Sequence, residues 1–255
     1  MEEKGNNMAL ASLLIRNEQW EQLRPLLETL HPADIAELIE RTPEDQRTAV
    51  FEMLDDEHKA DVLAELDDAV EEELLERMSP EKISDIVEEM APDDAADLLG
   101  EMDEDRSESI LKLMDREDSE DVRELLTYEE DTAGGIMTSD FVAMPSHRTA
   151  RDALETISSL ELDEPLHFIY VVDDDGMLCG YVQLWKVLKA GNREQTLEAL
   201  TETDIFFART DTDQEEVARL MSKYDLSSLP VLDAMGRLVG RVTIDDIVDV
   251  MEEEA

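Results

Sequence analysis

The chain has 255 residues, of which 68 are acidic and 22 are basic, and its formal net charge is −46. Such a surface is a poor partner for nucleic acid and for anionic membranes, and a good one for divalent cations that prefer oxygen ligands. No apolar run reaches the roughly 18 residues of a membrane span, and the single Cys179 excludes an internal disulfide framework and a cysteine-based zinc site. A simpler interpretation of the charge, solubility or adaptation to high salt, stays open.

A twelve-residue ladder of apolar positions runs through the first half of the chain. Its first column consists of Val50, Val62, Leu74, Ile86, Leu98, Ile110 and Val122. The second column, four residues later, consists of Leu54, Leu66, Met78, Met90, Met102, Met114 and Leu126. The third, one residue after the first, consists of Phe51, Leu63, Leu75, Val87, Leu99 and Leu111. Spacing of i, i+1 and i+4 places three apolar side chains on one helical face.

Each unit of the ladder is predicted to form its own short helix. In one unbroken helix the apolar stripe would rotate by about 120° per repeat, so no partner could follow it. A charged coiled coil, the alternative, needs a period near 3.5 residues. We expect a right-handed superhelix over residues 1–130, with a first helix at Ala9–Asn17. Later helices are expected to start near His31, Thr42, Asp55, Asp67, Ser79, Ala91, Asp103 and Asp115.

Strands are predicted after Gly134 and Gly135, which break the helical run. The expected strands are 141–144, 167–172, 177–183, 204–208, 229–232 and 237–243, and the expected helices are 150–160, 184–189, 213–224 and 244–253. This order is a β-α-β-β-α unit that occurs twice, with a linker and first copy at 131–200 and a second copy at 201–255. Each copy is too small for a secure core, so the two are expected to pack together. The fold class is therefore α+β multidomain.

The tandem of β-α-β-β-α units resembles a pair of cystathionine-β-synthase (CBS) domains. With the helical array before it, the chain from about residue 20 onward resembles the cytosolic part of the MgtE-type magnesium channels. The most specific matches are Glu129-Glu-Asp-Thr-Ala-Gly-Gly-Ile-Met-Thr138 and Arg209-Thr-Asp-Thr-Asp-Gln-Glu-Glu-Val-Ala-Arg-Leu-Met221. The resemblance implies a homodimer formed through the CBS domains, at the cytoplasmic face of the cell membrane. It also implies that this chain is an excised soluble fragment without the transmembrane pore domain.

Acidic side chains recur on one face of the last predicted helix, where Asp245, Asp249 and Glu252 are spaced i, i+4 and i+7. Like charges at this spacing destabilise an isolated helix by about 0.2–0.5 kcal/mol per pair. The spacing therefore indicates either a solvated acidic helix end or a bound cation, and alone it favours solvation. The resemblance implies the cation, because members of the family bind several Mg²⁺ ions between the helical domain, the CBS pair and the connecting helix.

The resemblance assigns the metal ligands position by position. On the helical domain they are Asp61, Asp93 and Asp97. On the CBS side they are Asp213, Asp225, Asp246, Asp249 and Glu254, with the backbone oxygen of Gly135 and, as a weaker neighbour, Glu215. Family members often carry Glu where Asp61 stands, so its shorter side chain would draw the backbone closer or leave a water between. Because Mg²⁺ keeps several waters, loose and shared sites of low affinity are expected.

A nucleotide site is the second ligand hypothesis. The segment Gly240-Arg-Val-Thr-Ile-Asp-Asp246 matches the CBS pattern in which a Thr hydroxyl, here that of Thr243, meets phosphate and an Asp, here Asp246, takes the ribose hydroxyls. The first repeat, Gly180-Tyr-Val-Gln-Leu-Trp-Lys186, lacks both groups, so at most one ATP site per chain is expected. The alternative is that Thr243 ends a strand and caps the last helix.

Two functions from different classes follow from these patterns. The leading one is a Mg²⁺-sensing regulatory region, in which bridging ions close the pore of a magnesium channel as negative feedback. The alternative is a soluble adenine-nucleotide-sensing CBS protein whose helical array docks a protein partner. An enzyme is not expected, because the sequence shows no nucleophile motif, phosphate-cradling P-loop or acid–base pair. A regulator that has lost a catalytic hydrolase or kinase part is a third, weaker interpretation.

Overall fold

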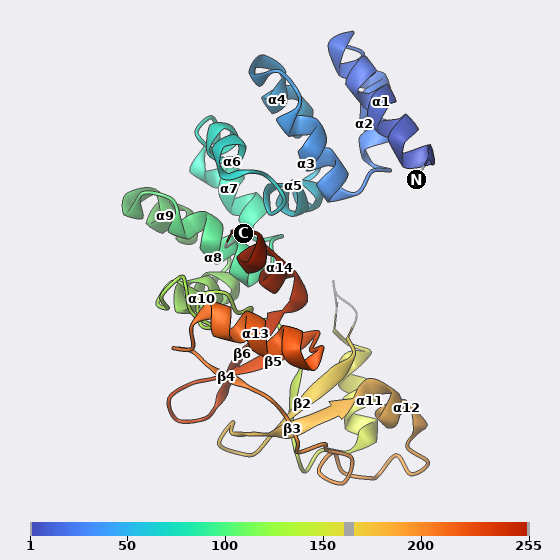
Figure 1. Cartoon of the computed structure of the whole chain (residues 1–255), viewed down its shortest axis with the longest axis vertical. Coiled ribbons are helices and arrows are strands. Elements are labelled where there is room, and N and C mark those ends of the chain that lie inside the picture. The colour runs from blue at the N-terminus through green and yellow to red at the C-terminus, as the bar shows by residue number, and fades with distance from the viewer. Residues whose placement is uncertain (1, 161–165, 254–255) are drawn as a thin grey trace. The chain divides into compact units, whose positions relative to one another are not determined.

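The computed structural model describes residues 2–160 and 166–253, and the chain divides into two compact units. A helical unit extends to Glu120, and a mixed unit of strands and helices begins at Asp121 (Figure 1). The last helix of the array crosses this boundary. Among the described residues, no helix is both long enough and apolar enough to cross a membrane.

Among the residues that the structure describes, ten short helices make up the array. They are α1 (Glu2–Arg16), α2 (Trp20–Leu27), α3 (Pro32–Glu40), α4 (Glu44–Phe51), α5 (Asp56–Leu63), α6 (Asp68–Leu75), α7 (Pro80–Val87), α8 (Pro92–Gly100), α9 (Glu104–Leu111) and α10 (Arg116–Leu125). The predicted starts from residue 31 onward fall within two residues of the helices α3 to α10. The first helix begins earlier than predicted, and α2 is a separate helix that the ladder does not reveal, because it lies before the repeat becomes regular.

The ladder forms the core of the helical unit. Every residue of the first and third columns is buried, from Val50 and Phe51 to Ile110, Leu111 and Val122. Helices α4 to α7 each end in a tight turn in which a residue of the second column donates its amide to a carbonyl oxygen of the third column; Leu54 N lies 3.1 Å from Phe51 O. The turn redirects the chain every twelve residues, which is why the apolar face of each helix stays on the shared core.

Helices two steps apart in sequence pack side by side. Helix α3 packs on α1 and α5, and α7 packs on α5 and α9, so the odd-numbered helices form a row (Figure 1). Helices α4 and α6, which are also two steps apart, are joined by an ion pair in which Arg47 Nη1 lies 2.7 Å from Glu73 Oε2. Both side chains are largely buried, and Arg47 also donates to the Thr42 and Glu40 carbonyl oxygens. Contacts two helices apart therefore hold the array together.

The second unit contains two β-α-β-β-α repeats. The first consists of β1 (Ala143–Pro145), α11 (Ala150–Ile157), β2 (Phe168–Val172), β3 (Leu178–Gln183) and α12 (Leu184–Lys189). The second consists of β4 (Ala208–Arg209), α13 (Gln214–Tyr224), β5 (Ser228–Leu232), β6 (Leu238–Thr243) and α14 (Ile244–Glu253). Both sheets have three strands in chain order, the first pair parallel and the second antiparallel.

Two predicted strands are corrected by the structure. The first strand lies two residues later than predicted, and the strand predicted at 204–208 shrinks to the two residues of β4. Residues 204–207 are irregular even though Ile205, Phe206 and Phe207 are apolar. Their side chains line surface clefts instead of a sheet, which is why β-propensity alone misplaced this strand.

The segment that precedes each repeat forms backbone hydrogen bonds with the last strand of the other repeat. Thr138, before the first repeat, exchanges two backbone hydrogen bonds with Arg241 of β6, at 2.8 and 3.0 Å. Glu202, before the second repeat, does the same with Tyr181 of β3, at 2.8 and 3.1 Å. The two repeats thus form one symmetric body, as expected for copies that are too small to fold alone. Tyr170 in β2 joins them as well, because its hydroxyl lies 3.2 Å from Ser228 Oγ.

Candidate functional site

The three metal candidates of the helical unit lie on two helices. Asp93 and Asp97 are one turn apart on α8, and Asp61 lies on α5. Asp97 and Asp61 are exposed, whereas Asp93 is only 8% exposed although its side chain carries a carboxyl group. A buried carboxylate in the first turn of α8 is favoured by the positive end of the helix dipole. Proline at the start of α8 fixes this turn, because Pro92 occupies the first helical position without needing an amide donor.

A strong negative potential surrounds this part of the helical unit. Burial, followed by the carboxylates of Glu101, Asp68, Asp97 and Asp94 in that order, raises the pKa of Glu71 on α6 to about 7. Four carboxylates therefore act on one side chain, and two of them belong to α8. A divalent cation near Asp97 would relieve this repulsion. Sequence reasoning missed Glu71 and Glu101, since neither stands on a matched family position.

Two candidates of the second unit are brought together by a backbone bridge. The segment 131–134 pairs with 210–214: Ala133 N donates to Thr212 O at 2.7 Å, and Gln214 N donates to Asp131 O at 3.0 Å. Gly135 follows this bridge, and Asp213 lies on it as the residue that caps α13. A side chain at Gly135 would collide with the backbone oxygens of Glu129 and Glu130, each 2.5 Å from an ideal Cβ, so glycine is required there.

The other candidates of this unit lie apart from that bridge. Asp225 is the C-cap of α13 in a left-handed conformation, so the 11-residue helix separates it from Asp213 by about 18 Å. Glu215, the weaker neighbour, forms an ion pair with Arg219. Asp246 and Asp249 lie on α14, and the side-chain position of Asp249 is not described. Glu254 lies outside the described residues.

The donor chemistry of these residues fits Mg²⁺, because every candidate supplies a carboxylate or carbonyl oxygen. Within the described residues, no three His, Cys, Asp or Glu side chains approach closely enough to hold a metal ion by themselves. Neither unit alone therefore presents a complete carboxylate site among its described residues. Sites of one or two carboxylates completed by water, which suit Mg²⁺, remain compatible with this arrangement.

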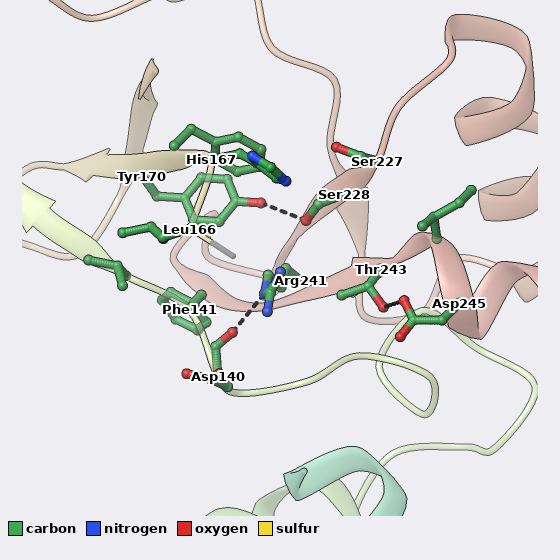
Figure 2. A pocket seen from close by; sticks show the side chains of 13 residues that line it. Asp140, Phe141, Leu166, His167, Tyr170, Ser227, Ser228, Arg241, Thr243 and Asp245 are labelled. Carbon is green, nitrogen blue, oxygen red and sulfur yellow. Dashed lines mark hydrogen bonds between the residues drawn. The ribbon is translucent and has the colours of Figure 1, made fainter. Parts of the chain in front are cut away.

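A cleft between the two repeats is bordered by Thr243, one of the two predicted nucleotide residues (Figure 2). Its cavity measures about 180 Å³, and it is lined by Asp140, Phe141, His167, Tyr170, Arg241 and Thr243, among others. Burial raises the pKa of Tyr170 to about 12, so its hydroxyl stays protonated beside Ser228. Arg241 donates to the Asp140 carbonyl oxygen at 2.7 Å. Because strand residues alternate, Arg241 shares the face of Thr243, a signal that sequence reasoning overlooked.

Thr243 and Asp246 form the start of α14. The Thr243 amide and hydroxyl donate to Asp246 Oδ2 at 2.8 and 2.7 Å, and Thr243 also contacts Asp245. Thr243 and Asp245 line the cleft, whereas Asp246 is not among its lining residues. The geometry therefore supports a capping role for Thr243 and Asp246 at the start of α14. This is the alternative to nucleotide binding that the sequence left open. A hydroxyl, a carboxylate and the Arg241 guanidinium nevertheless border the same cavity (Figure 2).

Comparison with known proteins decides the family. The family model for the MgtE intracellular N domain matches residues 30–131, and the CBS domain model matches residues 133–193 and 197–253. A crystal structure of the cytosolic domain of the Mg²⁺ channel MgtE in complex with ATP is 35% identical, with a TM-score of 0.86 over 94% of this chain and 99% of that one. This chain belongs to the MgtE family.

Two further relatives agree with this assignment. The crystal structure of the soluble part of a magnesium transporter is 29% identical, with a TM-score of 0.85 over 99% of both chains. The magnesium transporter MgtE of Thermus thermophilus is 46% identical over 129 residues, which are 50% of this chain and 28% of the transporter. The chain therefore corresponds to the cytosolic region of MgtE proteins, and the matched part is little more than a quarter of the length of that transporter. The predicted fold class and the predicted family are confirmed.

Proposed function

We propose that this chain is the Mg²⁺-sensing regulatory region of a magnesium channel or transporter. Ions shared between carboxylates of the helical unit and of the CBS unit would hold the two together, and this closed state would shut the pore as negative feedback. The observation that carries the proposal is the acidic environment around α8, where Asp97 and its neighbours act together on Glu71. Membership of the MgtE family supports the choice of Mg²⁺ over other divalent cations.

Electrostatics supplies the switch. Without metal, two acidic faces repel each other over a distance of about 8 Å at physiological salt. Each shared Mg²⁺ ion would add two positive charges between them, so metal binding and closure favour each other. A change from 1% to 99% closed needs about 5.5 kcal/mol of differential binding. Several weak ions can supply this together, and they would give a steep response to the Mg²⁺ concentration.

Small-angle scattering in EDTA and in about 20 mM MgCl₂, well above the dissociation constant expected for a weak site, tests the proposal. Mg²⁺ should reduce the radius of gyration of the wild-type chain. The variant Asp97→Asn, which changes an exposed side chain, should need a higher Mg²⁺ concentration for the same change. Asp93→Asn combined with Asp97→Asn should lose most of it. Profiles that are identical with and without Mg²⁺ would refute the proposal.

A matched control removes two charges elsewhere on the helical unit. Asp45→Asn combined with Asp85→Asn changes two exposed carboxylates on α4 and α7 that are not metal candidates. If the control shifts the response as strongly as the α8 variant does, the effect comes from net charge and not from bound ions. In that case the simpler interpretation, an acid-rich surface for solubility or salt, is the better one.

The CBS unit is proposed to form the homodimer. Helix α14 presents Ile244, Val248 and Met251, spaced i, i+4 and i+7, and all three are about half exposed. An apolar stripe of this kind is typical of a helix that packs on a partner. Val248→Asp should therefore shift the chain toward monomer in sedimentation equilibrium. Leu113→Asp, at an equally exposed position on the helical unit, should not.

Adenine nucleotide binding is proposed as a second function of the cleft in Figure 2. The support is the Arg241 guanidinium beside the Thr243 hydroxyl, together with the ATP complex of the related MgtE cytosolic domain. ATP should give a calorimetric signal that Arg241→Gln weakens about tenfold, the loss of roughly 1.4 kcal/mol expected for a charged hydrogen bond to phosphate. Arg237→Gln, which disrupts an ion pair with Asp233 outside the cleft, is the control. Equal ATP affinity in both variants would contradict this assignment.

A further inference from the structure

A separate cleft lies within the second repeat, between the edge strand β4 and helix α13. Its cavity measures about 410 Å³, a volume typical of ligand pockets. Part of its lining is apolar and consists of Phe207, Val217 and Leu220, and Phe207 is 46% exposed. The cleft shares no lining residue with the cleft in Figure 2, so it is distinct from the proposed nucleotide site.

Three cationic side chains border this cleft, those of Arg209, Arg219 and Lys223. Such a group is unusual in a chain with 68 acidic and 22 basic residues. Within the described part of the chain Lys223 forms no ion pair, and its ammonium lies 4.9 Å from the centroid of the Tyr224 ring. Arg209 forms no ion pair with a described residue either, because its guanidinium donates to the neutral carbonyl oxygen of Asp233 at 3.1 Å. Two positive charges therefore lie at the cleft without a carboxylate partner among the described residues.

The third cation is paired, but only at the surface. Arg219 forms an ion pair with Glu215, four residues earlier on α13, and the two side chains are 72% and 42% exposed. An exposed pair of this kind contributes little to stability, so the anionic group of a ligand can compete with Glu215 for the guanidinium. Glu216 is the one carboxylate in the described lining, so the cations outnumber it three to one. The cleft therefore favours an anion over a cation.

The first repeat does not share this arrangement. Thr149 and Asp213 are the N-caps of α11 and α13, and superposing these two caps aligns the repeats. In this alignment Ala143 takes the place of the Phe207 ring. At the positions of the three cations the first repeat has Pro145, Glu155 and Ser159. The fold therefore requires neither a large ring nor a cation at these positions, which is the reason to assign them to a ligand.

We propose that the cleft between β4 and α13 binds an amphiphilic anion, a carboxylate on an unbranched alkyl chain. The alkyl chain would lie on Phe207 and Leu220. The carboxylate would lie between Arg219 and Lys223, which are one turn apart on α13. The apolar part of the lining separates this ligand from a simple inorganic anion. The proposal goes beyond Mg²⁺ sensing and does not depend on it, because none of the lining residues is a metal candidate.

Calorimetry with octanoate on the whole chain, in EDTA and about 150 mM NaCl, tests the proposal. EDTA removes metal ions that could bridge the carboxylate to acidic side chains, and the salt screens the net negative charge. Octanoate should bind at one site per chain. Hexanoate, which is two methylene groups shorter, should bind more weakly, by up to about fifteenfold if both groups are buried.

Variants of the lining should change the octanoate affinity in opposite directions. Arg219→Gln combined with Lys223→Gln should weaken binding about tenfold, and both side chains are exposed, so the variant should fold. Phe207→Ala should also weaken binding about tenfold, because the alkyl chain loses an apolar surface. Glu216→Gln should strengthen binding by a factor of about 2–5, because it removes the carboxylate that competes with the ligand for the cations.

Matched controls repeat these changes elsewhere on the CBS unit. Arg151 forms an exposed ion pair, as Arg219 does. Lys189 lies over an aromatic ring, as Lys223 does. Arg151→Gln combined with Lys189→Gln therefore removes the same charge from similar surroundings and should leave the octanoate affinity unchanged. The control for the ring is Phe206→Ala, since Phe206 borders another surface cleft and not this one.

A neutral probe of the same length separates recognition of charge from simple apolar burial. Because 1-octanol lacks the carboxylate, it should bind about tenfold more weakly than octanoate. Equal binding of the two probes would overturn the proposal, and so would octanoate binding that the combined Arg219 and Lys223 variant leaves intact. An equal loss of affinity in the combined Arg151 and Lys189 variant would also overturn it, because net charge and not the cleft would then govern binding.

Discussion

Glu71 is the side chain on which the acidic character of the helical unit acts most strongly. Burial and then the neighbouring carboxylates, with Glu101 first, raise its pKa from 4.5 to about 7. The folded state therefore binds a proton at Glu71 between these two pH values, whereas the unfolded state releases it. Because the folded pKa is the higher one, the stability that protonated Glu71 contributes is complete below about pH 4.5 and is lost as pH rises to about 7.

The first prediction concerns Glu71→Gln. The amide cannot ionise, so this variant should be more stable than the wild type at pH 8, by about 1–3 kcal/mol, and the two should converge near pH 4.5. Denaturant unfolding of the helical unit between pH 4.5 and 8 measures the difference. Glu72→Gln, on the exposed side of the same helix, is the control. Parallel curves for the two variants would contradict the prediction.

Gly180 and Gly240 lie where each repeat meets the segment that precedes the other repeat. An ideal Cβ on Gly180, which has φ of 150°, would lie 2.2 Å from the Glu202 carbonyl oxygen. On Gly240 it would lie 2.9 Å from the Thr138 carbonyl oxygen. The second prediction is that Gly180→Ala destabilises the CBS unit by about 2–4 kcal/mol, since a backbone atom must move. Gly191→Ala, which meets no atom within 4 Å, should change the melting temperature little.

At the scale of the elements, the ion pair between α4 and α6 is expected to matter more than the many pairs on the surface. Removing one partner would leave the other, partly buried charge without its ion pair, so Glu73→Ala should destabilise the helical unit by about 1–3 kcal/mol. The i, i+4 pair of Lys112 with Glu108 is exposed, and Lys112→Ala should cost less than about 1 kcal/mol. Urea unfolding of both variants checks the third prediction, and equal losses would refute it.

The elements of this chain differ in how far their sequence determines them. Helices α3 to α10 could be placed because the ladder is regular and because residues such as Asp55 and Ser79 mark their starts. Helix α2 was not predicted because it lies before the repeat becomes regular, and because the break before it has a positive φ at Glu18 and no proline or glycine. Strand β4 was placed too early because Ile205 to Phe207 are apolar for a reason unrelated to sheet formation, namely the clefts that they line.

The site was less predictable than the elements. The metal candidates on α8 and the capping residue Asp213 were assigned from the family resemblance, and their role as ligands stays a prediction. The negative potential around Glu71 could not be predicted in this way. It arises from side chains of two helices that are separated in sequence and come close only in the folded structure. The aromatic rings that border another surface cleft, Tyr181, Trp185 and Phe206, were overlooked for the same reason, because they are scattered in sequence.

For the whole molecule, two compact units predict two unfolding steps. In EDTA, scanning calorimetry should show separate transitions, and Gly180→Ala should lower only that of the CBS unit whereas Glu73→Ala should lower only that of the helical unit. In excess Mg²⁺ both transitions should move upward, because a ligand that binds only the folded state stabilises it by mass action. A single transition in EDTA, lowered equally by both variants, would contradict this fourth prediction.

The packing of the odd-numbered helices on one another limits how such an array can change in length. Removing a single twelve-residue repeat would turn every later odd-numbered helix into an even-numbered one. Each later helix would then lie beside a helix that it does not normally contact. Removing two consecutive repeats, about 24 residues, would take one helix from each row and preserve all later pairings. Relatives with shorter or longer arrays are therefore expected to differ by pairs of helices.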